Sequence, residues 1–148
     1  MTFPKDTELW LKGLKHISEN TASDFLDIEI VEIDDDHIVL TMPITNKTRQ
    51  PMGLLHGGIN MVLAETAASL HSCWGIDLSE KTPVGIEING SHVRSASAGT
   101  VKAVGRVIRR TGSLMFHQVD IYLAETDELL STARVTNYYK RIKPEKQE

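Results

Sequence analysis

Residues 50–76 read QPMGLLHGGINMVLAETAASLHSCWGI, and this stretch decides the fold that the sequence predicts. It is the most apolar segment of the chain and carries a single carboxylate, Glu65. We predict a helix over about 57–74, followed by Gly75, because glycine is a common stop signal just after a helix. A long helix with so little charge is expected to lie inside a sheet that wraps around it, rather than on the surface.

The flanking segments supply that sheet. Apolar residues recur at helical spacing over about 5–17, which predicts a short amphipathic helix. β-Branched and alternating stretches predict two strands before the central helix, the first including Leu26 and Ile28, and four strands after it. The sequence therefore predicts one α+β domain over 1–148 with a mostly antiparallel sheet, and a flexible tail over about 142–148.

Composition limits the class of protein. The chain has 148 residues, of which 41% are hydrophobic and 24% charged, as in ordinary globular domains. Its net charge of −4 gives no reason to expect binding to nucleic acid or to an anionic membrane. Cys73 is the single cysteine, which excludes an internal disulfide and a multi-cysteine zinc site. The sequence shows no secretory signal or membrane-spanning run, so we expect a soluble cytoplasmic protein.

Glu65 is the residue of this helix that most needs an explanation. The residues that share its stripe on a 3.6-residue period are Gly58, Met61, Val62, Ala68, Ser69 and Ser72. A carboxylate among such small and apolar neighbours is a candidate nucleophile or general base, since burial perturbs its proton affinity. The alternative is a solvated glutamate, or one that is paired with a distant arginine.

The start of the helix offers a site for negative charge. Gly57 and Gly58 follow His56, and the first N–H groups of a helix have no partner within it, so they suit an anion or a developing oxyanion. The alternative is that the two glycines only permit a tight turn. Glu65 lies eight residues after Gly57, about 12 Å along one helix. If the two act on one carbonyl, two antiparallel copies of the helix are needed, and hence a homodimer.

Two segments carry a family resemblance: QPMGLLHGGINMVLAETAAS and VGIEINGSHVRSA. They resemble the hotdog-fold acyl-CoA thioesterases. The likeness is strongest to the branch that holds the 4-hydroxybenzoyl-CoA thioesterase of the Arthrobacter type and the 1,4-dihydroxy-2-naphthoyl-CoA hydrolase of menaquinone synthesis, with the phenylacetic-acid-pathway thioesterases nearby. The resemblance implies a curled antiparallel sheet around the long helix. It also implies homodimers, usually paired into tetramers, with active sites at the dimer interface.

The resemblance also assigns catalytic roles. It implies that Glu65 is the nucleophile or the base that activates water, and that the N–H of Gly57 polarises the thioester oxygen. Gln50 and His56 would orient the thioester, and the hydroxyl of Ser69 would assist one turn after the carboxylate. Each position has a plainer alternative: a loop residue at Gln50, a helix cap or core residue at His56, and a small packing residue at Ser69.

The segment SHVRSA matches the region that contacts CoA in this branch. Arg94 would reach a phosphate with its planar fork, His92 would contribute at the same end, and Ser95 is a weaker candidate. Met61 and Val62 would line an apolar acyl pocket, or else belong to the core.

The expected reaction is hydrolysis of an aromatic or hydroxyaromatic acyl-CoA, such as 1,4-dihydroxy-2-naphthoyl-CoA, to the free acid and CoA. No metal or cofactor is expected, because CoA is part of the substrate. Two alternatives remain open. One is an acyl-carrier-protein type of hydroxyacyl dehydratase, and the other is a non-catalytic acyl-CoA binding module. His71 is expected to be an interior or interface histidine, and Cys73 a buried small hydrophobe.

Overall fold

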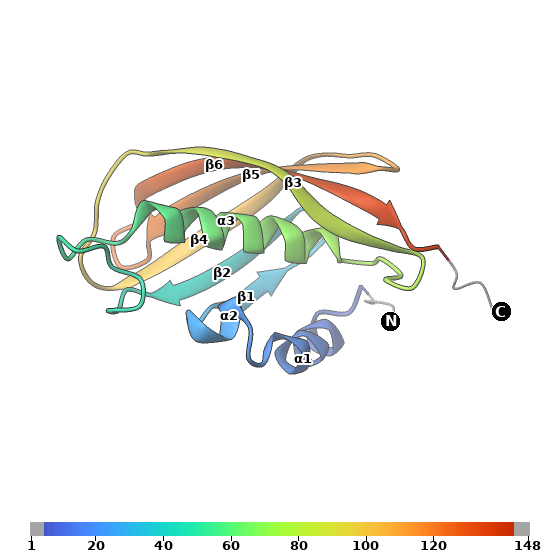
Figure 1. Ribbon diagram of the computed structural model, residues 1–148, viewed down its shortest axis with the longest axis horizontal. Helices are drawn as coiled ribbons and strands as arrows, with labels where there is room; N and C mark the ends of the chain where they lie inside the picture. Colours follow the sequence, from blue (N-terminus) through green and yellow to red (C-terminus); the bar gives the residue numbers. More distant parts are fainter. Residues whose placement is uncertain (1–4, 144–148) are drawn as a thin grey trace.

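The computed structural model describes residues 5–143, and the chain runs through three helices and six strands in that range (Figure 1). The helices are α1 (Thr7–Ser18), α2 (Ala22–Phe25) and α3 (Gly57–Ser72). The strands are β1 (Glu29–Ile33), β2 (His37–Pro43), β3 (Lys81–His92), β4 (Thr100–Arg110), β5 (Leu114–Leu123) and β6 (Glu128–Arg141). The expected C-terminal tail lies mostly outside the described residues.

The strands form a single antiparallel sheet in the order β1-β2-β4-β5-β6-β3. The sheet curls around α3, as Figure 1 shows. This is the α+β hotdog architecture that the sequence predicts. β3 is one edge of the sheet, and its antiparallel register with β6 runs from Lys81 opposite Arg141 to His92 opposite Ser131.

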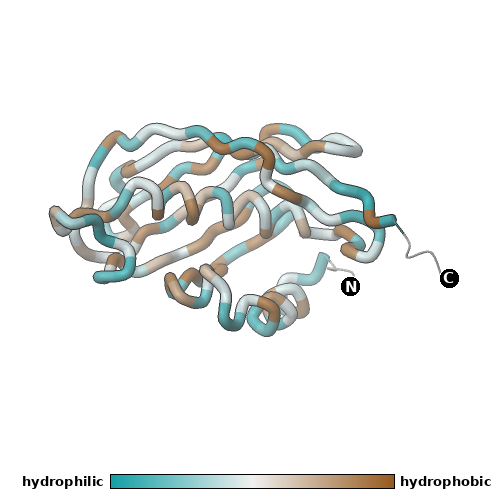
Figure 2. The backbone as a smooth tube through the Cα atoms, in the orientation of Figure 1, coloured by the Kyte–Doolittle hydropathy of each residue, from teal (hydrophilic) through white to brown (hydrophobic). Residues whose placement is uncertain are grey.

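The face of α3 that meets the sheet is built from small and aliphatic side chains. Leu63, Ala64, Ala67 and Ala68 are fully buried there, in the hydrophobic layer between the helix and the sheet. Figure 2 shows hydrophobic segments both along α3 and along the strands around it. Alanines allow the strands to approach the helix axis closely, so that the sheet can wrap a helix without leaving voids. The helix ends at Ser72, and Gly75 follows in the left-handed region with φ 68°.

The N-terminal segment covers one end of this layer. The side chain of Asp6 accepts the N–H of Leu9 and caps α1, whose Trp10 is fully buried. The ring of Trp10 packs edge-on against Trp74, with 6.0 Å between ring centroids. Within residues 5–143, the structure has no helix that is long and apolar enough to cross a membrane.

The segment before β1 differs from the sequence-based expectation. The strand predicted to include Leu26 and Ile28 begins only at Glu29, and residues 22–25 form the short helix α2. Local hydrogen bonds explain the difference. The N–H groups of Leu26 and Ile28 donate to the backbone oxygens of Ala22 and Ser23, and the side chain of Asp24 accepts the N–H of Asn20. Such local side-chain acceptors compete with strand pairing, and here they favour a helical turn.

A buried histidine pair ties the end of α3 to the sheet. Nδ1 of His71 lies 2.9 Å from Nε2 of His117 on β5, and Nε2 of His71 lies 2.8 Å from the backbone oxygen of Asp34. Both rings are inaccessible to solvent, as expected for His71. Burial lowers the pKa of both rings, and for His117 burial together with the charges of His71 and Arg110 lowers the pKa to about 3. The pair is therefore neutral at physiological pH.

Candidate active site

A pocket of about 400 Å³ opens at the N-terminal end of α3. Five residues singled out from the sequence line it together: Gln50, Gly57, His92, Arg94 and Ser95. They come from the loop before α3, from its first turn and from the end of β3. The fold thus brings the two matched sequence segments to one place.

The first turn of α3 is shaped by its cap. Nδ1 of His56 accepts the N–H of Gly58 at 2.9 Å, so His56 is the N-cap residue that the sequence left as one alternative. Because Nδ1 is the acceptor, a neutral His56 carries its proton on Nε2. Gly57 is the first helical residue, and its N–H has no carbonyl partner within the helix. This N–H, at the positive end of the helix dipole, is a donor for an oxyanion.

Gln50 is held in a tight turn beside this donor. Its backbone N–H donates to the oxygen of Leu54 at 2.8 Å, and its backbone oxygen accepts the N–H of Gly53, which has φ 82°. Its side-chain oxygen accepts the N–H of Met52. The amide nitrogen of Gln50 is therefore the end of this side chain that can donate to a ligand in the pocket.

Glu65 lies in a second and separate pocket. This hollow of about 290 Å³ is lined by Val62, Glu65, Thr66, Ser69 and Leu70. The expectation that Glu65 is enclosed by apolar neighbours is wrong for the single chain, because its side chain is exposed. The side of α3 that carries Glu65 faces away from the sheet, because the opposite side of the helix packs against the strands.

One glycine makes room for this carboxylate. A Cβ atom built on Gly85 of β3 would collide with Oε1 of Glu65 and would lie 3.3 Å from its carboxyl carbon. The bare backbone of Gly85, next to an irregularity in the β3–β6 register, therefore provides the surface on which Glu65 rests. Gly85 was not singled out from the sequence, although a glycine inside a strand often marks a place where another group approaches the backbone closely.

Ser69 stands one turn beyond Glu65 in the same hollow. Its hydroxyl oxygen accepts a hydrogen bond from Nδ2 of Asn137 on β6 at 3.0 Å, so its own proton remains available to a ligand or to the carboxylate. Val62 lines the hollow as well. Met61 packs against the core instead, with its sulfur 2.9 Å from a Cβ built on Gly90.

The SHVRSA segment divides between two surroundings. Nη1 of Arg94 pairs with Oε1 of Glu128 at 2.8 Å, in an exposed ion pair that contributes about 0–1 kcal/mol. His92 lies deeper. A Cβ built on Gly57 would be only 2.5 Å from its Nε2. His92 is thus placed against the start of α3.

The two pockets share no lining residue. Gly57 and Glu65 are eight residues apart on one continuous helix, a separation of about 12 Å along its axis. An oxyanion donor and a nucleophile must both lie about 3 Å from the reacting group. One chain therefore cannot bring Gly57 and Glu65 to the same reacting group.

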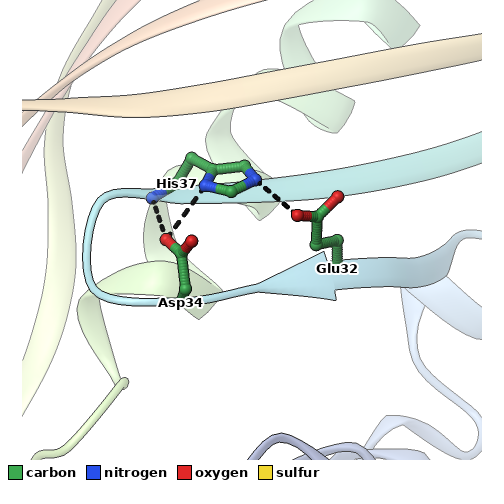
Figure 3. Close-up of side chains that lie close together, drawn as sticks. All are labelled: Glu32, Asp34 and His37. Atoms are coloured by element: carbon green, nitrogen blue, oxygen red, sulfur yellow. Dashed lines mark hydrogen bonds and ion pairs between the residues drawn. The ribbon is translucent and has the colours of Figure 1, made fainter.

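A third cluster lies at the β1–β2 turn and was not anticipated from the sequence (Figure 3). One ligand atom each from Glu32, Asp34 and His37 lie within 4.8 Å of one another, a spacing that a divalent cation can bridge. In the structure both ring nitrogens of His37 are used by carboxylates, Nε2 by Glu32 and Nδ1 by Asp34, each at 2.9 Å. These residues line neither pocket, so we assign them no part in the reaction.

Comparison with known proteins identifies the class. Residues 52–137 match the family model of the thioesterase superfamily. The chain is 36% identical to the 1,4-dihydroxy-2-naphthoyl-CoA hydrolase of Escherichia coli (strain K12) over 129 residues, covering 87% of this chain and 93% of the relative. The chain therefore belongs to the thioesterase superfamily.

Solved structures agree with this assignment. A thioesterase from Haemophilus influenzae superposes with a TM-score of 0.84 at 34% identity, covering 93% of this chain and 94% of that one. A mutant thioesterase from Pseudomonas aeruginosa gives a TM-score of 0.84 at 31% identity, covering 89% and 94%. The protein is a thioester hydrolase. Its relatives favour hydrolysis over the dehydration or non-catalytic binding that the sequence left open.

Proposed function

We propose that the protein hydrolyses an aromatic or hydroxyaromatic acyl-CoA, such as 1,4-dihydroxy-2-naphthoyl-CoA, to the free acid and CoA. Relatives from Escherichia coli and Listeria monocytogenes bear the name of that hydrolase at 36% and 37% identity, and the matches cover 93% of each. The observation that carries the proposal is the pair of half-sites on α3. One offers hydrogen-bond donors at Gly57 and Gln50, and the other offers the Glu65 carboxylate.

The two halves would be joined in a homodimer. β3 is a 12-residue edge strand, and its outer side pairs with no strand among residues 5–143. Val84 and Ile86 on this strand are 37% and 57% exposed. A long apolar edge strand is a ready surface for pairing with another chain. Two-fold symmetry would place α3 of one subunit antiparallel to that of the other, so that each Gly57 meets a Glu65. Further pairing into a tetramer is part of the proposal.

The reaction follows from this arrangement. The thioester carbonyl oxygen accepts hydrogen bonds from the Gly57 N–H and the Gln50 amide, which stabilise the charge that develops on it. Glu65 of the partner subunit either attacks the carbonyl carbon or removes a proton from the attacking water. The C–S bond breaks, the acyl carbon gains an oxygen from water, and CoA leaves as thiol after taking up a proton. The Ser69 hydroxyl orients the carboxylate or the water.

The rest of the substrate would extend along the rim of the first pocket. Arg94 and Ser95 line it, and Arg94 is exposed enough to exchange its partner Glu128 for a phosphate of CoA. Val62, beside the carboxylate, would contact the acyl group. The proposed reaction uses no metal and no cofactor.

The test is release of free thiol from a panel of aromatic and aliphatic acyl-CoAs by wild type and Glu65→Gln. We expect aromatic esters to be turned over fastest, and kcat of the variant to fall by about 10²–10⁴-fold. Glu8→Gln is the matched control, because it removes an exposed helical carboxylate that lines neither pocket. Wild-type turnover of no ester, or full activity of a folded Glu65→Gln, would contradict the proposal.

A further inference from the structure

Three polar side chains from distant parts of the sequence meet near the N-terminal end of α3. Asn60 on α3 donates from Nδ2 to Oγ of Ser131 on β6 at 2.9 Å. The same Oγ lies 2.8 Å from Nδ1 of His92, at the end of β3. Asn60 is 4% exposed and Ser131 is fully buried, and both Asn60 and His92 line the pocket. The three form a chain of hydrogen bonds that runs from the interior to the start of α3.

The number of protons shared by these three side chains determines the tautomer of His92. A serine hydroxyl has one proton to donate and two lone pairs that accept. The oxygen of Ser131 already accepts the N–H of Asn60, and its own proton needs an acceptor because the group is buried. His92 Nδ1 is the acceptor within reach. Nδ1 is then unprotonated, and a neutral His92 carries its proton on Nε2.

That proton lies where the carbonyl of the substrate is expected. The Nε2 edge of the ring stands over the Cα of Gly57, since an added Cβ would come within 2.5 Å of Nε2 and 2.8 Å of Cδ2. His92 and Gly57 line the same pocket. Because Gly57 has no side chain, the ring of His92 can lie directly against the first turn of α3.

We propose that His92 is a third donor to the thioester carbonyl oxygen through Nε2–H, beside the Gly57 N–H and the Gln50 amide, and that Ser131 and Asn60 are positioning residues that hold it in this tautomer. This role rests on the proposed acyl-CoA hydrolysis. It replaces the contact with CoA that the sequence suggested for His92.

The amide of Asn60 decides which group donates in each hydrogen bond of this series. Its Oδ1 has no hydrogen-bond partner among residues 5–143, whereas its Nδ2 is the donor to Ser131. If Asn60 offered an acceptor instead, the Ser131 proton would turn toward it, and His92 would have to donate from Nδ1. Asn60→Asp makes that change with nearly the same shape, because a carboxylate accepts and does not donate. It should move the His92 proton away from the pocket.

The tautomer can be read without any activity. In ¹⁵N-histidine-labelled protein at pH 8.5, where an ordinary histidine is neutral, long-range ¹H–¹⁵N spectra distinguish the two tautomers. The His92 signals are assigned by their loss in His92→Gln. We expect the Nε2–H form in wild type, a mixture in Ser131→Ala, the Nδ1–H form in Asn60→Asp, and the wild-type form in Ser131→Thr, which keeps the hydroxyl.

Kinetics tests the consequence. Ser131→Ala should lower kcat by about 10²-fold with less than threefold change in KM, as expected for loss of an interaction made in the transition state. In His92→Gln, whose amide nitrogen can replace Nε2–H without help from Ser131, adding Ser131→Ala should change kcat by less than about threefold. A merely structural role for Ser131 would instead cost the same factor in both backgrounds.

Three results would overturn the proposal: an Nδ1–H tautomer in wild type, an unchanged tautomer and kcat in Ser131→Ala, or equal losses in the two backgrounds. Failure of the proposed function looks different. If wild type hydrolyses no acyl-CoA while His92 shows the Nε2–H form in wild type and a mixture of tautomers in Ser131→Ala, the substrate assignment fails and the positioning by Ser131 and Asn60 stands.

Discussion

Subunit mixing tests whether each active site uses two chains. Glu65→Gln removes the carboxylate of one half-site. Gly57→Ala disturbs the other, because its methyl carbon would lie 2.5 Å from Nε2 of His92 and must displace that ring. Each variant alone should keep about 1% of wild-type kcat or less, as expected when a donor or a reacting group is misplaced by about 1 Å.

The two variants should restore each other when mixed. In a dimer with one chain of each kind, one site carries both changes, and the other combines the intact Gly57 of one chain with the intact Glu65 of its partner. Equal mixing with random pairing makes half of the dimers mixed, so activity should rise to about one quarter of wild type. The assay is thiol release after the two proteins are unfolded and refolded together.

The control is each variant refolded alone, with its oligomeric state checked by light scattering. If Gly57 and Glu65 acted within one chain, every site in a mixed dimer would carry one of the two changes. The mixture would then show only the mean activity of the two variants. That result, with mixed dimers verified by differently tagged chains, would refute the inference that the site spans two subunits.

Three further predictions concern Gly85, the buried histidine pair and Cys73. Gly85→Ala should lower kcat by about 10²-fold with little loss of stability, because its methyl group takes the space of the Glu65 carboxylate; activity and thermal melting distinguish the two effects. Stability should fall as pH drops below about 6.5, because the unfolded chain then protonates histidines that the fold keeps neutral. His117, whose pKa in the fold is about 3, should lower the folding equilibrium constant by up to about tenfold per pH unit, and His71 acts in the same direction. His117→Gln should reduce that slope in denaturant titrations at pH 7.5 and 5.5, and an equal slope would contradict the assignment. Cys73, whose pKa burial raises to about 12, should react with a disulfide reagent at pH 8 only after unfolding.

Local sequence pattern was sufficient for the architecture. The apolar run around Leu63 and Ala67, with Glu65 as its single carboxylate, predicted a helix enclosed by a sheet, and the alternating segments predicted the antiparallel strands around it. Periodicity determines which residues share a face, so it also placed Gly57 and Glu65 a fixed distance apart along one helix. The incorrect extension of the first strand toward Phe25 came from a local competition, in which Asp24 bonds a nearby backbone N–H.

Only the tertiary structure decided what surrounds each group. Sequence spacing does not show that Asn60 lies within hydrogen-bond distance of Ser131, 71 positions away, or that His92 stands over Gly57. The register of β3 with β6 places His92 opposite Ser131, and the packing of α3 against these two strands brings Asn60 and Gly57 to them. The exposure of Glu65 follows in the same way, from which face of α3 the curled sheet covers. Register and coverage depend on contacts distant in sequence, so a pattern read along the chain indicates candidate site residues but not their neighbours.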